Sequence, residues 1–84
     1  MLKEVAEMVY AYYIVEEIRF ITSKNEFTTY GISVSSEGLV LNTISDISTD
    51  YAFVKSLADL CNRLQLHPMQ LKEVVEDFLN TYKP

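Results

Sequence analysis

Two amphipathic segments in the second half of the chain, residues 50–64 and 68–82, constrain its fold more than any other feature. In each segment, apolar residues recur with the i, i+3, i+4, i+7 spacing that places them on one face of a helix. The apolar positions are Phe53, Val54, Leu57, Leu60, Cys61 and Leu64 in the first segment and Leu71, Val74, Val75, Phe78, Leu79 and Tyr82 in the second. Burying one such side chain is worth roughly 1.5–3 kcal/mol, so the rest of the chain must supply a surface that both helices cover.

The boundaries of both helices carry capping signals. Ser48 or Thr49 is the expected N-cap of the first helix, because a hydroxyl there accepts a hydrogen bond from an unpaired backbone N–H. Pro68 suits the first position of the second helix, where its missing N–H is no loss. We therefore predict helices over residues 50–64 and 68–82. The core that the two helices share is predicted to contain Leu57, Leu60, Leu64, Val75 and Phe78.

The first half of the chain has the composition of β-strands. Aromatic and β-branched residues are concentrated over residues 10–22, 27–35 and 39–44, with polar turns between these runs. Gly31 lies inside the second run, which indicates a bulge or a place where something large lies over the backbone. The sequence thus predicts one α+β domain over residues 1–84. A three-stranded antiparallel meander is followed by two helices packed on one sheet face, and residues 1–9 form either a short helix or an extended lead-in.

The first strand is apolar on both faces. One face carries Tyr12, Ile14, Ile18 and Phe20, interrupted by Glu16, which marks a bulge, protects an edge or is a buried acid. The other face carries Tyr13, Val15 and Ile21. Two helices cover only one face of a small sheet, and the sequence does not decide which. Because monomers rarely expose a large apolar patch, we expect a homodimer whose interface includes Tyr13, Val15 and Ile21. The alternative is that residues 2–9 fold back over this patch.

Charge and composition exclude several classes of partner. The formal net charge is −5, and the seven basic residues are scattered along the chain, so we expect no binding to nucleic acid or to acidic membrane surfaces. The single cysteine, Cys61, has no partner for an intramolecular disulfide, which favours a reducing compartment. No secretory signal is expected, and the apolar run at residues 8–15 is too short to span a bilayer. We expect a cytoplasmic protein.

Few residues are candidates for chemistry. Cys61 and His67 are the only soft ligands or nucleophiles, whereas a structural zinc site needs about four ligands. Cys61 lies on the apolar face of a helix, so a buried thiol is expected. Glu73, Glu76 and Asp77 lie on the polar side of the second helix and are expected to be solvated. The two glycines form no phosphate-binding loop. The sequence therefore predicts no enzyme, no catalytic residue, no metal and no cofactor.

Three stretches resemble known proteins. They are Tyr30-Gly31-Ile32, Leu60-Cys61-Asn62-Arg63 and the run from Leu71 to Leu79, LKEVVEDFL. Over residues 12–79 the chain resembles a family of small uncharacterised proteins of spore-forming Gram-positive bacteria. The resemblance implies an intracellular bacterial protein with no assigned activity and no site residues to transfer.

The sequence leaves three functions open. The first is a non-enzymatic protein-interaction or regulatory module that self-associates. The second is a DNA-associated transcriptional regulator, in which the helical pair over residues 50–82 acts as a helix-turn-helix. The carboxylates on the outward side of its second helix oppose that reading, since phosphates repel them. The third is a small-molecule sensor with a tyrosine-lined pocket.

Overall fold

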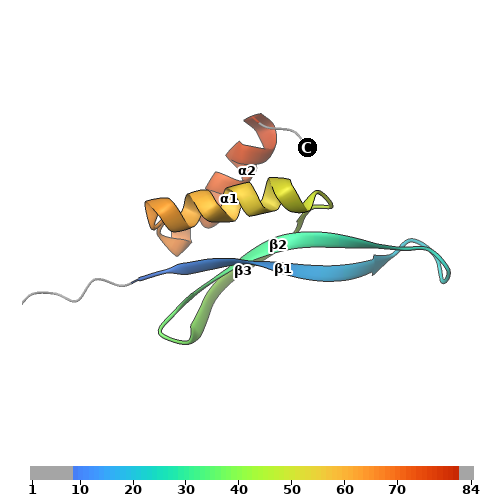
Figure 1. Ribbon diagram of the computed structural model, residues 1–84, viewed down its shortest axis with the longest axis horizontal. Coiled ribbons are helices and arrows are strands. Elements are labelled where there is room, and N and C mark those ends of the chain that lie inside the picture. The colour runs from blue at the N-terminus through green and yellow to red at the C-terminus, as the bar shows by residue number, and fades with distance from the viewer. Residues whose placement is uncertain (1–8, 82–84) are drawn as a thin grey trace, which may run out of the picture.

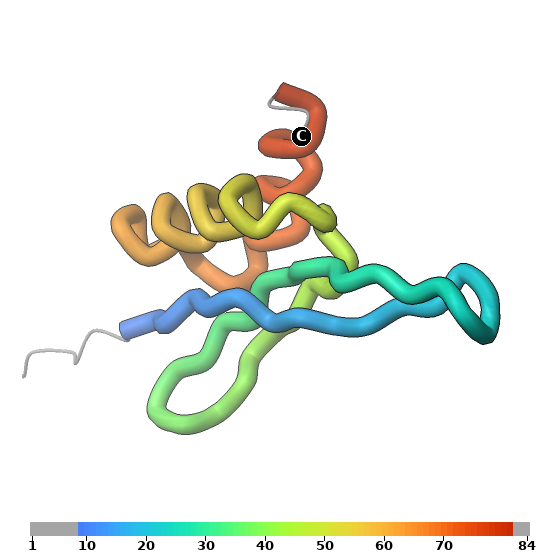
Figure 2. The backbone as a smooth tube through the Cα atoms, turned by 45° about the vertical axis from the view of Figure 1, so that its right-hand side comes forward, coloured from blue at the N-terminus to red at the C-terminus, as the bar shows by residue number. Residues whose placement is uncertain are grey.

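The computed structural model describes residues 9–81 and contains one sheet and two helices. The elements are, in order, β1 (Ala11–Phe20), β2 (Glu26–Ser36), β3 (Leu39–Ser48), α1 (Tyr51–Leu64), the 3-10 turn η1 (Pro68–Gln70) and α2 (Leu71–Thr81). The strands form an antiparallel sheet in the order β1-β2-β3, and both helices lie on one side of it (Figures 1 and 2). The predicted α+β architecture is confirmed. Apart from Val9, the segment over residues 1–9 lies outside the described residues.

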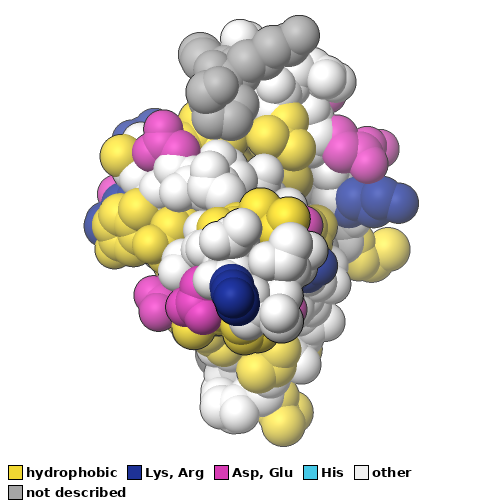
Figure 3. Space-filling model, turned by 90° about the vertical axis from the view of Figure 1, so that its right-hand side faces the viewer, with side chains coloured by type: hydrophobic (Ala, Val, Ile, Leu, Met, Phe, Trp, Pro, Cys, Tyr) yellow, Lys and Arg dark blue, Asp and Glu magenta, His cyan; other side chains and the backbone are white. Residues whose placement is uncertain are grey.

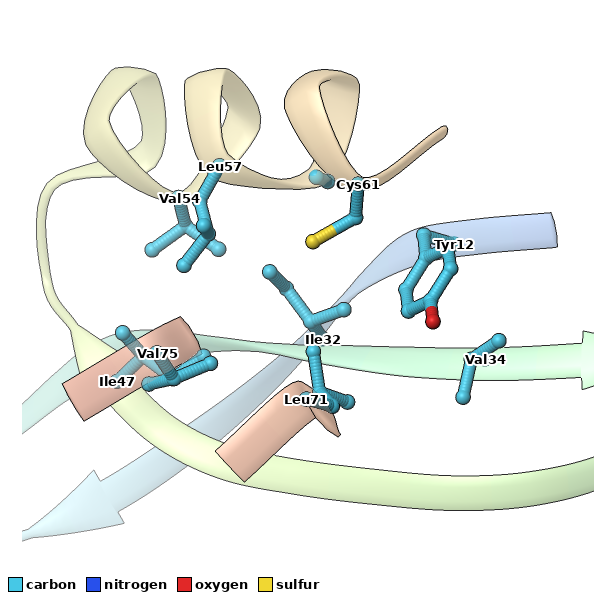
Figure 4. Packing of buried hydrophobic residues seen from close by; sticks show 10 residues of the cluster. Tyr12, Ile32, Val34, Ile47, Val54, Leu57, Cys61, Leu71 and Val75 are labelled. Atoms are coloured by element: carbon cyan, nitrogen blue, oxygen red, sulfur yellow. The ribbon is translucent and has the colours of Figure 1, made fainter. Parts of the chain in front are cut away.

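The core lies between the central strand β2 and the two helices. Ile32 and Val34 on β2 are fully buried and face the inward side chains of α1 and α2 (Figure 4). The buried cluster consists of Tyr12, Ile32, Val34, Ile47, Val54, Leu57, Ala58, Cys61, Leu71 and Val75. The predicted buried thiol of Cys61 is confirmed, because the helical spacing that places it on the apolar face also points it at the sheet.

A bulge in β3 lies across Gly31 of β2. Tyr30 pairs with Ser48 and Ile32 pairs with Ile44, so β3 has extra residues between the two pairs. A Cβ atom on Gly31 would lie 2.2 Å from the carbonyl oxygen of Ile44, so only glycine allows this approach. The bulge predicted at Gly31 is confirmed. The bulge also carries β3 to Ser48, beyond the predicted end at residue 44.

The longer β3 changes the start of α1. Asp50, not Ser48 or Thr49, is the N-cap, and its Oδ1 accepts a hydrogen bond from the backbone N–H of Phe53 at 3.3 Å. Ser48 still belongs to the sheet, and its hydroxyl accepts from the N–H of Asp50 at 3.0 Å. The predicted cap was wrong because the sequence pattern did not reveal that the strand continues through the bulge.

The inward face of α1 is narrower than predicted. It contains Val54, Leu57, Ala58 and Cys61. Leu64 is 62% exposed, so its placement in the core was wrong. It is the last residue of α1, and the chain leaves the helix at Gln65 in a left-handed conformation. Helical spacing alone did not show that this end of the helix is joined to β1 through Asn62 and Gln65, with Leu64 left in solvent.

The second helix begins later than predicted. Pro68 starts the 3-10 turn η1, which is capped by His67, and α2 follows from Leu71. Leu71 and Val75 are buried against the sheet. Phe78 is only half-buried and contacts Phe53 with ring centroids 5.0 Å apart. The two helices thus meet at the margin of the core rather than at its centre.

The hairpin of β1 and β2 extends beyond the helical layer (Figure 1). Tyr12 and Ile14 face the helices, which decides the face that the sequence left open. Ile18 and Phe20 lie further along the same face but are 54% and 67% exposed, because no helix covers them. Glu16 is exposed and β1 pairs with β2 without a register shift. Glu16 therefore marks no bulge and is no buried acid.

Candidate functional site

One end of the outer edge of β1 is covered by side chains of α1. Asn62 accepts a hydrogen bond from the backbone N–H of Tyr12 through Oδ1 and donates one to its carbonyl oxygen through Nδ2, both at 2.8 Å. Gln65 forms the same pair of hydrogen bonds with the backbone of Tyr10, both at 2.9 Å. The two amide side chains thus hydrogen-bond to β1 as a neighbouring strand would.

These contacts show which backbone groups of β1 face away from β2. In a regular antiparallel ladder, the N–H and C=O groups of alternate residues point to opposite edges. Because the backbone N–H and C=O groups of Tyr10 and Tyr12 point outward, the same groups of Ile14, Glu16, Ile18 and Phe20 do so too. Between residues 9 and 81 no backbone or side-chain partner for the outward groups of Ile14, Glu16 and Ile18 is found. We call the outward groups from Ile14 to Phe20 the free edge.

A pocket lies between β1 and α1, next to the start of the free edge. Its volume is about 330 Å³, and it is lined by Tyr12, Tyr13, Ile14, Tyr51, Lys55, Ala58 and Asp59. Lys55 donates hydrogen bonds to both carboxylate oxygens of Asp59 at 2.9 Å, and this contact raises the pKa of the ammonium group. The charges at the pocket rim are therefore already paired with each other.

The far half of the free edge combines exposed apolar side chains with a charged pair. Figure 3 shows the end of the molecule toward which the hairpin points, where apolar side chains reach the surface beside acidic ones. Ile18 and Phe20 are among the exposed residues. On the opposite face of β1, Arg19 Nη2 lies 3.1 Å from Glu17 Oε1, and its Nη1 lies 3.9 Å from Asp46 Oδ2. Both side chains of the Glu17–Arg19 pair remain partly exposed.

The structure places the three predicted interface residues at two locations. Tyr13 and Val15 lie side by side on the face of β1 that points away from the helices, and Tyr13 is 40% exposed. Ile21 follows the end of β1 in the turn and is 71% exposed. The roles of Asn62 and Gln65 were not predicted from the sequence, because nothing in the helical pattern distinguishes an amide that binds a strand from one that faces water.

The reactive groups in the core are held in their neutral forms. Burial raises the pKa of the Cys61 thiol to about 11. Burial, followed by the charges of Cys61 and Tyr10, raises the pKa of the Tyr12 phenol to about 12. The Tyr12 hydroxyl donates to the carbonyl oxygen of Leu66. Neither group is therefore an ionised nucleophile near neutral pH.

The other polar side chains have structural contacts or face solvent. His67 accepts a hydrogen bond from the N–H of Met69 at 3.2 Å, and Glu73, Glu76 and Asp77 are exposed as predicted. Within residues 9–81 no three His, Cys, Asp or Glu side chains gather where a metal ion would bind. In the same part of the chain, every helix is too short or too polar to cross a membrane.

Comparisons with known proteins give one match. No curated protein and no solved structure matches the chain. A family model does match, over residues 1–81, which is nearly the whole chain. The chain therefore belongs to a family of unknown function, DUF6514.

Proposed function

We propose that the protein is a non-enzymatic protein-interaction or regulatory module, and that it self-associates by adding an extended segment to the free edge of β1. The observation that carries this proposal is the row of outward backbone groups at Ile14, Glu16 and Ile18, for which the described chain offers no partner. An exposed strand edge binds another strand through main-chain hydrogen bonds, and nearby pockets select its side chains. The pocket between β1 and α1 has the position that such a site requires.

The edge of β1 is better suited to strand addition than the edge of β3. The pairing of β3 with β2 contains two register shifts, and irregular edges of this kind deter pairing with another chain. Asn42 of β3 also donates a hydrogen bond to the carbonyl oxygen of Pro68 at 3.4 Å. By contrast, β1 is regular throughout and contains neither lysine nor proline, two residues that commonly block an edge, although Glu16 places a charge on its helix-facing side.

A proline substitution on the free edge tests this proposal. The N–H of Ile18 points away from β2, so Ile18→Pro removes a donor for an added strand and no hydrogen bond of the sheet itself. Ile18→Val is the matched control, since it keeps both the N–H and a β-branched side chain. We expect the parent and Ile18→Val to show a rising mass in light scattering after size exclusion, from micromolar to millimolar concentration.

The proline variant is expected to remain monomeric over the same range, with an unchanged circular dichroism spectrum. A parent that stays monomeric at every concentration overturns the proposal. So does a folded Ile18→Pro variant that associates as well as Ile18→Val, because the added segment then lies elsewhere. If Ile18→Pro loses its fold, Glu16→Pro tests the same edge, since its N–H also points outward.

Small-molecule binding is a second candidate, favoured by the pocket between β1 and α1. Tyr12, Tyr13 and Tyr51 contribute to its walls, and its volume is at the lower end of the range for ligand sites, roughly 300–1,000 Å³. A fragment screen by NMR tests this candidate. Chemical-shift changes confined to the pocket residues, and lost in Tyr51→Ala, support it; a screen without hits at these residues counts against it.

DNA binding has less support than either candidate. The exposed residues of α2 include one basic side chain, Lys72, and three carboxylates, Glu73, Glu76 and Asp77. A recognition helix with this charge repels phosphates. We expect no binding of duplex DNA above background in a fluorescence anisotropy titration at physiological salt. Submicromolar affinity that falls steeply with salt contradicts this expectation.

A further inference from the structure

We infer that the segment added to the free edge is β1 of a second copy, antiparallel to the first, with a two-fold axis at Ile18. This inference rests on the proposed function and specifies the partner and its register. Three observations carry it: the order of side chains along β1, the outward backbone groups at every second residue of β1, and the place where α1 stops covering the edge.

The backbone groups of the free edge are compatible with this register. Only the even-numbered residues of β1 direct their backbone N–H and C=O groups outward. They must therefore pair with even-numbered residues of the second copy. With the axis at Ile18, Ile18 lies opposite the partner's Ile18, and Glu16 lies opposite the partner's Phe20. Each of these pairs exchanges two hydrogen bonds, one in each direction.

The side chains on the other face are complementary in the same register. Glu17 lies opposite the partner's Arg19, and Arg19 lies opposite the partner's Glu17. Directly opposed residues of unlike charge stabilise a sheet, whereas like charges destabilise it. One step further out, Val15 lies opposite the partner's Ile21. Two of the three residues predicted from sequence to form an interface thus face each other across the axis.

Neighbouring registers lack this complementarity. An axis at Glu16 or at Glu17 places two carboxylates directly opposite each other, and an axis at Arg19 places two guanidinium groups opposite each other. The axis at Ile18 is the one position between residues 16 and 19 that brings unlike charges together. It also joins two isoleucines that are 54% exposed in the single chain.

The side chain of Asn62 sets the end of the paired segment. It occupies the backbone groups of Tyr12, so an added strand has free partners only from Ile14 onward. In the proposed register, Ile14 lies opposite the partner's Thr22, which is in the turn that follows β1. The partner's β1 ends at Phe20, opposite Glu16, so it stops two residues before the free edge ends at Ile14.

The helices leave room for the second copy. Asn62 and Gln65 hold one end of α1 at Tyr12 and Tyr10, and Tyr51 at the other end contacts Tyr30, the neighbour of Glu16. Helix α1 therefore lies alongside residues 10 to 16 of β1, and Ile18 is beyond its end. The two copies of α1 lie on opposite sides of the axis and do not collide.

Exchanging charges tests the register. Arg19→Glu gives two carboxylates at positions 17 and 19, and Glu17→Arg gives two guanidinium groups, so each variant opposes like charges in its own homodimer. Both variants keep a net negative charge overall, since each change shifts the net charge of −5 by two. We expect each variant alone to be monomeric at concentrations where the parent is dimeric. An equimolar mixture is expected to regain the dimer mass, because unlike charges then face each other.

A cysteine cross-link locates the axis. Facing residues of a hydrogen-bonded antiparallel pair have Cα atoms about 5.5 Å apart, within the range of a disulfide. We expect Ile18→Cys to form a disulfide-linked dimer under mild oxidation. Glu16→Cys and Phe20→Cys are the matched controls, because the two copies of either residue lie roughly 13 Å apart along the strands. The native Cys61 is buried and does not compete.

The outcomes separate this inference from the proposed function. Rescue by mixing, together with a cross-link at Ile18→Cys alone, supports the register. If Ile18→Pro abolishes association but mixing gives no rescue, the register is overturned and strand addition at the free edge stands. The same holds if Glu16→Cys or Phe20→Cys cross-links faster than Ile18→Cys. A parent that never associates overturns the proposed function itself. Circular dichroism of each variant confirms that the fold is retained before any mass is interpreted.

Discussion

The side-chain amide of Asn62 is hydrogen-bonded to both backbone groups of Tyr12, so a helix residue completes the edge of a strand fifty positions earlier. The contact joins α1 to β1 and also limits the part of β1 that remains available to another chain. The same side chain therefore joins the two elements and, in the proposed function, sets where an added strand can begin to pair.

Replacing this amide is predicted to destabilise the fold. In Asn62→Ala the N–H and C=O of Tyr12 lose their partners, which costs roughly 1–3 kcal/mol when such groups are partly buried. The free energy of unfolding, measured by urea denaturation, is expected to fall by this amount. Arg63→Ala, a change at an exposed neighbour, is expected to stay within about 0.5 kcal/mol of the parent. Equal midpoints for the two variants would show that the contact contributes nothing.

The two glycines are predicted to differ in their tolerance of alanine. At Gly31 an added Cβ atom overlaps the backbone of Ile44, and the β3 bulge must move. We expect Gly31→Ala to lose at least the roughly 1–3 kcal/mol typical of an overpacked site. Gly38 has a φ of 82° but open space around it, so Gly38→Ala costs about 1–2 kcal/mol of backbone strain alone. Thermal melts that rank Gly38→Ala as the less stable variant would contradict the close approach at Gly31.

Stability is predicted to fall at alkaline pH. The pKa of Cys61 rises from 9.0 to about 11 on folding, and that of Tyr12 rises from 10.0 to about 12. Both groups hold their protons more tightly in the folded state, so above about pH 9 they ionise first in the unfolded chain. This ionisation favours the unfolded chain and lowers the free energy of unfolding. We expect the urea midpoint to decline from pH 9 upward.

Alanine at position 61 separates the two contributions to this decline. In Cys61→Ala the part that begins near pH 9 is expected to disappear, and the part due to Tyr12 is expected to remain above pH 10. The native thiol should also react slowly with an alkylating reagent until the protein unfolds. Rapid labelling of the folded protein at neutral pH would show that Cys61 is accessible.

The loss of stability caused by core substitutions is predicted to follow the burial of the side chain rather than its size. Leu71 is fully buried, so Leu71→Ala is expected to cost roughly 2–5 kcal/mol. Phe78 is half-buried, so Phe78→Ala is expected to cost less than the roughly 3–5 kcal/mol of a fully buried phenylalanine. Urea denaturation of both variants checks the order. A larger loss for Phe78→Ala would place the centre of the core between the two helices.

The sequence by itself determined the elements and their order. Helical spacing identified the two helices and the buried thiol of Cys61, and strand composition identified the meander, because both patterns depend on residues close together in the chain. Gly31 indicated a bulge, since the absence of a side chain inside a strand is a local signal.

Only the tertiary structure decided the features that depend on distant residues. The exposure of Leu64, the end of β3 at Ser48 and the face of β1 that the helices cover all depend on how the helices and the strands are placed against one another. The free edge is of this kind too. Asn62 and Tyr12 have no relationship in the sequence pattern, and the limit of the edge follows from the packing of α1 beside β1, which brings the amide within 2.8 Å of the strand.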